Sequence, residues 1–84
     1  MTKLVFGGVP LWLMRKYLKS LGASAVAENT FVFPDAEVML SEVEPLCVGS
    51  LTVGRLEVGV RASSAEREAT LVAAIRLKAL RGGG

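Results

Sequence analysis

The chain contains no histidine and only one cysteine, Cys47, and both scarcities narrow the chemistry open to it. Histidine is the commonest general base and activator of nucleophiles, so its absence excludes a hydrolase triad. A single cysteine cannot form an internal disulfide, and without cysteine or histidine partners it cannot build a zinc site. We therefore expect no metal, no cofactor and no enzymatic activity. The apolar neighbours of Cys47 predict a buried thiol in a cytoplasmic protein.

Long apolar runs and side-chain amides are also scarce. No run reaches 18 apolar residues, and the first 22 residues carry four cations, which argues against a membrane span or a signal peptide. Glutamine is absent and Asn29 is the only asparagine, a depletion of thermolabile amides that suggests a thermophile.

What the chain has in quantity is apolar residues. At 84 residues it is long enough for one domain, to which we assign residues 1–81, with a flexible glycine tail at 82–84. Apolar residues make up 51% of the chain, more than a small monomer readily buries. Charge is also segregated, because the ionisable residues from 28 to 44 are all acidic and the flanking segments are net basic. Both features favour contact with a partner surface.

Two helices are predicted. In the first, between Pro10 and a C-terminal cap at Gly22, apolar side chains recur at helical spacing at Leu11, Met14, Leu18 and Leu21. The second begins at Ser63-Ser64-Ala65-Glu66, a capping box with Ser63 as the N-cap, and runs to about Leu80. Arg76 falls within its apolar arc, so this arginine either extends into solvent or pairs with a carboxylate.

The remaining segments predict strands. A short apolar run at 4–6 forms the first, and residues 25–33 form two more around a turn at Glu28-Asn29. Residues 36–44 alternate as a strand does, although Asp35 could cap a short helix there; we choose the strand. Residues 48–62 predict a hairpin with a type II′ turn at Gly54-Arg55, which sets Val53 opposite Leu56.

The resulting order is β-α-β4-α, a two-layer α+β fold with a mostly antiparallel sheet and both helices on one face. This order resembles one repeat of the TATA-binding protein. In size and composition the chain is similar to uncharacterised small thermophile domains, one of which is appended to a protein like the small sulfur-carrier subunit of molybdopterin synthase. The resemblance covers the whole chain through element order and composition, and it implies no active site.

Three patterns suggest ligands, and each has a plainer explanation that we favour. Gly7 and Gly8 precede a helix, where backbone N–H groups bind anions, but two glycines also make a tight turn. The final Leu-Arg-Gly-Gly-Gly resembles the glycine tails of sulfur carriers, but those tails follow a strand and this one follows a predicted helix. Glu42 and Glu44 with Asp35 or Glu37 could bind a hard cation, but they also fit a solvated strand edge.

The residues that best fit a partner surface lie on the first helix. Trp12 falls among Arg15, Lys16 and Lys19 on the solvated face, and tryptophan and arginine are enriched at interface hot spots. We therefore predict a non-enzymatic protein-interaction domain that self-associates as a homodimer, with these four residues and Arg76 at the interface and the acidic 35–44 segment of the other copy beside Trp12.

Three alternatives remain. The resemblance favours an accessory or sulfur-carrier-related role in molybdenum-cofactor biosynthesis. A small-ligand pocket between the sheet and the helices is a second. Nucleic-acid binding is a third, which Glu66 and Glu68 disfavour because they would repel phosphates where a double-stranded-RNA-binding domain has lysines.

Overall fold

The computed structural model describes residues 1–82, except for the side chains of the last two, and confirms the predicted α+β class. The elements in chain order are β1 (Thr2–Gly7), α1 (Leu11–Ser20), β2 (Ser24–Ala27), β3 (Thr30–Phe33), β4 (Ala36–Val48), β5 (Leu51–Ala62) and α2 (Ala65–Gly82). The strand predicted at 36–44 is therefore present and continues to 48. Among residues 1–82, no helix is both long and apolar enough to cross a membrane.

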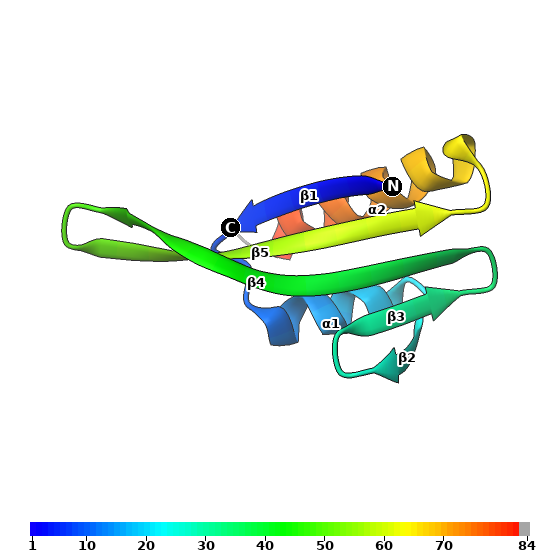
Figure 1. The fold of residues 1–84 in the computed structure, drawn as a ribbon, viewed down its shortest axis with the longest axis horizontal. Helices are drawn as coiled ribbons and strands as arrows, with labels where there is room; N and C mark the ends of the chain where they lie inside the picture. Colours follow the sequence, from blue (N-terminus) through cyan, green and yellow to red (C-terminus); the bar gives the residue numbers. More distant parts are fainter. Residues whose placement is uncertain (83–84) are drawn as a thin grey trace.

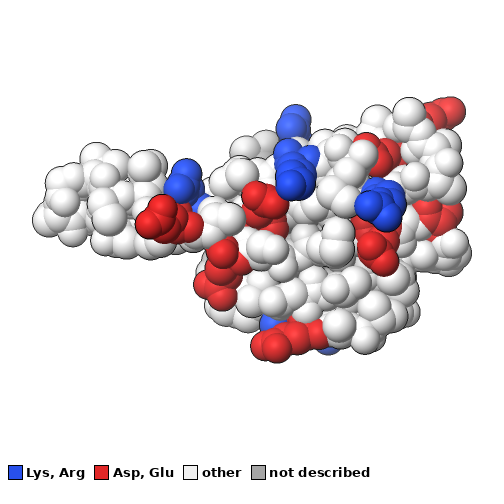
Figure 2. Space-filling view, in the orientation of Figure 1, with Lys and Arg blue, Asp and Glu red and all other residues white. Residues whose placement is uncertain are grey.

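The five strands form one sheet in the order β1-β5-β4-β3-β2, and neighbouring strands are antiparallel. Both helices cover the same face of this sheet, which lies in front of them in Figure 1. None of the described elements covers the other face, which we call the uncovered side, and Figure 2 views the molecule from that side. Basic and acidic side chains are interspersed there, as where Lys3 Nζ lies 3.9 Å from Glu57 Oε1. One sheet face therefore builds the core and the other meets water.

The core forms where the covered sheet face meets the two helices. On the sheet, Leu4 is paired with Val58 and Val58 with Leu40, so these three side chains share one face, and all are buried. The predicted stripe of α1 supplies Met14 and Leu18, which are fully buried. The matching stripe of α2 consists of Leu71, Ile75 and Ala79 at a spacing of four residues. The sheet and the two helices thus each contribute one apolar face to a single core.

The central hairpin turns at Gly49-Ser50, so the predicted turn at Gly54-Arg55 is wrong. The turn type fits the prediction, because Gly49 has a φ of +60° and Ser50 does not have a positive φ, as in a type II′ turn. The observed register sets Val53 opposite Leu46 instead of Leu56. It also pairs residues 36–43 of β4 with residues 55–62 of β5, so the two strands run side by side from the body of the sheet to the turn. Long-range pairing of the buried strands therefore decides between two suitable glycines.

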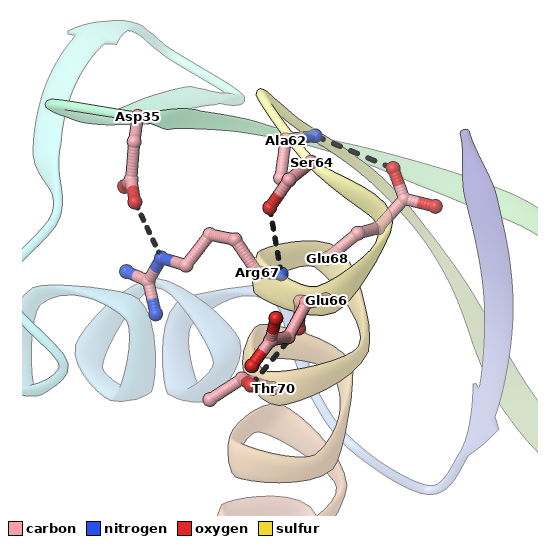
Figure 3. Close-up of polar contacts among 7 residues, drawn as sticks. All are labelled: Asp35, Ala62, Ser64, Glu66, Arg67, Glu68 and Thr70. Atoms are coloured by element: carbon pink, nitrogen blue, oxygen red, sulfur yellow. Dashed lines mark hydrogen bonds and ion pairs between the residues drawn. The ribbon is translucent and has the colours of Figure 1, made fainter.

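The helix α2 begins one residue later than predicted, with Ser64 as its N-cap. The Arg67 N–H donates to Ser64 Oγ at 3.1 Å, as Figure 3 shows. Ser63 lies one residue before this cap. Its own N–H donates to the Asp35 carbonyl at 2.9 Å in the preceding turn, so that N–H is not available to the Glu66 carboxylate as predicted. At its other end α2 includes Gly82. Gly83 and Gly84, the rest of the tail predicted to be flexible, lie outside the described residues.

Two charged side chains join the start of α2 to the strands. Arg67 Nε donates to Asp35 Oδ2 at 2.9 Å (Figure 3). The Arg67 guanidinium also lies 5.6 Å from the centroid of the Phe33 ring. Glu68 accepts the Thr2 hydroxyl at 2.6 Å and the Ala62 N–H at 3.3 Å. The Thr2 hydrogen bond is the main reason that the pKa of Glu68 is lowered, and burial opposes it. Glu66 was predicted to reach back to the N–H of the N-cap residue. The carboxylate that reaches back is that of Glu68, and it accepts from Ala62, two residues before the N-cap, so the contact is not a capping box.

Candidate functional site

A two-stranded arm, residues 43–55, extends from the fold where β4 and β5 continue beyond the rest of the sheet (Figure 1). Pairing between β3 and β4 ends at Met39, and pairing between β1 and β5 ends at Arg55. Beyond these points, within residues 1–82, β4 and β5 pair with each other and with no other strand. The arm lengthens the molecule to 43 Å, against 24 and 21 Å in the other two directions.

The root of the arm is fixed by a bulge and two hydrogen bonds. The register between the strands shifts between Val43 and Leu46, so β4 carries one extra residue there. Arg55 Nε donates to the Glu44 carbonyl at 2.8 Å across this bulge. The Gly8 N–H donates to the Gly54 carbonyl at 2.9 Å and ties β5 to the loop before α1. The arm is therefore anchored at one end and free along the rest of its length.

One face of the arm is entirely apolar. Leu46 is paired with Val53, and Val48 with Leu51, so these four side chains lie on the same side; we call them the apolar arm face. Leu51 is 68% exposed, Val48 59% and Leu46 49%. The opposite side carries Cys47 and Thr52, whose Sγ and Oγ1 atoms lie 4.0 Å apart.

The apolar arm face continues the uncovered side of the sheet. In β5, Leu56 and Val58 point toward the helices, so the odd-numbered Leu51 and Val53 point the other way. The position that a Cβ on Gly7 would take lies 3.7 Å from Val53 Cγ1, which places Val53 beside the uncovered side of β1. The molecule thus presents one continuous surface, charged over the body and apolar over the arm.

The arm carries no ionised side chain from Pro45 to Gly54, and in Figure 2 its charges gather at the root. Its backbone edges are also open. Because a two-residue turn makes Val48 and Leu51 a hydrogen-bonded pair, the N–H and C=O groups of Cys47 and Thr52 point outward. No third described strand lies beside them. An apolar face with open edges is suited to binding protein and offers no group for catalysis.

Almost the whole chain matches a known protein family. A family model described as "Archaeal MoaD-like protein" matches residues 2–84. The chain belongs to this family. No curated protein matches it. The match confirms, at the level of the family, the resemblance to a domain related to sulfur carriers; the thermophile origin stays a prediction.

The interface residues predicted for this MoaD-like protein lie outside the arm. Trp12 is 65% exposed on α1, among exposed Lys16 and Lys19. Arg15 is partly engaged within its own chain, because its Nη2 lies 2.8 Å from Asn29 Oδ1 and 3.6 Å from Glu28 Oε1. Arg76 is exposed on α2, the first of the two arrangements expected for it. Whether these residues meet a partner stays a prediction.

The structure also bears on the sites predicted at Cys47, at Gly7-Gly8 and at the acidic residues. Cys47 is exposed because it lies on the arm, so the prediction of a buried thiol is wrong. The N–H of Gly8 is already bound to Gly54, so it is not free for an anion, and Gly7 is paired with Arg55 within the sheet. Residues 1–82 contain no cluster of three or more acidic, cysteine or histidine side chains suited to a metal ion.

A hollow of about 350 Å³ lies at the root of the arm, lined by Leu11 at the start of α1 and by Leu56 of β5, so it opens between the sheet and the first turn of α1. The loop before α1 supplies Val9 and Pro10, and the arm supplies Pro45 and Arg55. Its volume is within the range of small-molecule sites. Sequence reasoning considered a pocket between the sheet and the helices but did not identify its residues, and it missed the arm. The available signal was the uncharged stretch 45–54, which contains Gly49-Ser50 as a second possible turn.

Proposed function

We propose that this archaeal MoaD-like protein is a non-enzymatic interaction domain that contacts partners through its arm. The apolar arm face carries the proposal. Burying one valine or leucine side chain fully contributes about 1.5–3 kcal/mol. Leu46, Val48 and Leu51 are each about half exposed or more. Covering them would release on the order of 3–5 kcal/mol before the cost of association.

The polar groups around the arm support a binding role over a catalytic one. Cys47 carries the one thiol of the chain, and its Sγ lies 4.0 Å from the hydroxyl oxygen of Thr52. A hydroxyl neither removes a proton from a thiol nor stabilises a thiolate as a cation would. Arg55 Nε donates a hydrogen bond to the Glu44 carbonyl and so stabilises the bulge. These contacts stabilise the arm and leave its apolar face for a partner.

Capture from the native host tests the proposal. The protein would be used as bait in three forms: wild type, Leu51→Asp on the apolar arm face, and Thr52→Asp on the opposite side as the matched control. We expect wild type and Thr52→Asp to retain the same partners, identified by mass spectrometry, and Leu51→Asp to lose them. If all three baits retain the same proteins, the arm is not the contact surface and the proposal fails.

A second candidate function is an accessory or sulfur-carrier-related role in molybdenum-cofactor biosynthesis, supported by the family match. Because α2 includes Gly82, the glycines follow a helix, which favours the accessory role over that of the carrier itself. Incubation with ATP and a sulfur-carrier adenylating enzyme distinguishes the two. An accessory protein keeps its mass, whereas a carrier gains an adenylate as pyrophosphate leaves. The accessory role also expects sulfur-carrier or molybdenum-cofactor proteins among the captured partners.

A further inference from the structure

We infer that the arm is covered by a second copy of this chain, so that each arm lies across the uncovered sheet side of the other about a two-fold axis. This inference rests on the proposed function and names its partner. An isolated two-stranded ribbon is marginally stable in water, and beyond its root this arm has no supporting layer. The second copy supplies that layer for both arms at once.

The charge pattern of the arm favours a copy of itself over a charged partner. In this dimer each arm crosses the body of the other copy, whose charges are of both signs, as at Lys3 and Glu57. From Pro45 to Gly54 the arm has no ionised side chain, so it brings no charge that the body would repel. A nucleic acid or an acidic peptide would find no opposite charge there.

The body of the molecule offers a place where the arm of the second copy can lie. Val5 is 56% exposed and Met39 is 37% exposed. Val5 is paired with Glu57 and Met39 with Gly59, both odd-numbered positions of β5, so both side chains lie on the uncovered side. A Cβ on Gly59 would lie 3.7 Å from Met1 Sδ, so the Met1 side chain, which is 54% exposed, covers Gly59 and adds to this apolar surface. Glu57 lies beside it and forms an ion pair with Lys3 at 3.9 Å. The apolar arm face and this receiving surface therefore point the same way, and two copies can meet face to face.

The size of the contact sets the strength of the dimer. Six residues per strand give the arm a length of roughly 20 Å, and two strands give it a width of roughly 10 Å. One arm therefore covers about 200 Å², and two arms with their two receiving surfaces bury about 800 Å². Stable interfaces bury about 1,200–2,000 Å². We therefore expect a reversible dimer with a dissociation constant in the micromolar range or weaker.

Sedimentation equilibrium from about 5 µM to about 1 mM protein spans this range of dissociation constants. We expect wild type to dimerise, Leu51→Asp to raise the dissociation constant at least tenfold, and Thr52→Asp to change it less than twofold. Leu51 is largely exposed, so its variant should keep the wild-type circular dichroism. Trp12→Ala tests the interface predicted on α1, and it should dimerise like wild type.

A spin label on Cys47 gives a second readout without other substitutions, because this is the only cysteine and it lies opposite the apolar arm face. We expect a distance between two labels in wild type that disappears in Leu51→Asp. The inference fails if wild type stays monomeric at 1 mM, if the two aspartate variants behave alike, or if Trp12→Ala alone dissociates the dimer. If wild-type bait retains only its own chain from the host, this inference stands and a role with other proteins fails.

Discussion

Leu51 and Leu56 provide a direct test of the hairpin register, because they are the same residue type on one strand in opposite environments. Leu56 is 1% exposed and Leu51 is 68% exposed. Replacing a buried leucine by alanine costs about 2–5 kcal/mol, because apolar contacts are lost and a cavity remains. Exposed positions change stability by less than about 0.5 kcal/mol. We therefore expect Leu56→Ala to lower the free energy of unfolding by at least about 2 kcal/mol and Leu51→Ala to leave it almost unchanged.

Urea unfolding followed by circular dichroism measures both free energies. Protein at about 1 µM keeps self-association out of the comparison, and a domain of this size should lose about 10 °C or more in Tm with Leu56→Ala. If the chain turned at Gly54-Arg55, both leucines would lie on one buried face. Equal losses in the two variants would therefore refute the register described above.

Further predictions concern the ends of the helices and the charge at Glu68. Hydrogen bonds lower the pKa of Glu68 from its usual 4.5, so its contribution to stability is present above pH 4.5 and is lost as the pH falls through the lowered pKa. Below about pH 5, the urea midpoint of Glu68→Gln should therefore fall less with decreasing pH than that of wild type. The same pH dependence in both proteins would contradict this. Ser64→Ala should cost about 1 kcal/mol in urea unfolding and Ser63→Ala much less, and the reverse order would restore the predicted cap. Gly22 has a φ of +103°, so Gly22→Ala should lower Tm, whereas a Tm at or above wild type would show that the backbone relaxes.

Much of the fold was predictable because periodicity survives in the core. The stripe that contains Met14 and Leu18 is buried as its spacing predicts, and Gly22 ends the segment in the left-handed region. The errors arose where two neighbouring residues satisfy the same local rule. Gly49-Ser50 and Gly54-Arg55 both suit a type II′ turn, and only pairing with distant residues of β4 selects the first.

The candidate site was less predictable than the fold, because alternation identifies an apolar face without showing what covers it. Leu51 and Val53 alternate with polar residues as core positions do, yet they lie on the uncovered side of the sheet, away from the helices. The exposure of Trp12 followed from its position on α1, but the engagement of Arg15 by Asn29 depends on the packing of α1 beside the β2–β3 turn. Contacts of that kind are set by tertiary structure.

The position of β1 at the sheet edge has a consequence for the order of folding. Strands β2 to β5 follow one another in sequence and in the sheet, so each can pair after closing a short loop. By contrast, β1 pairs with β5 across about 50 residues, which costs about 2 kcal/mol more in loop entropy than a five-residue loop. We expect β1 to dock after the folding transition state. Leu4→Ala, at a buried position of β1, should then accelerate unfolding and leave the refolding rate nearly unchanged, whereas slower refolding would place β1 in the nucleus.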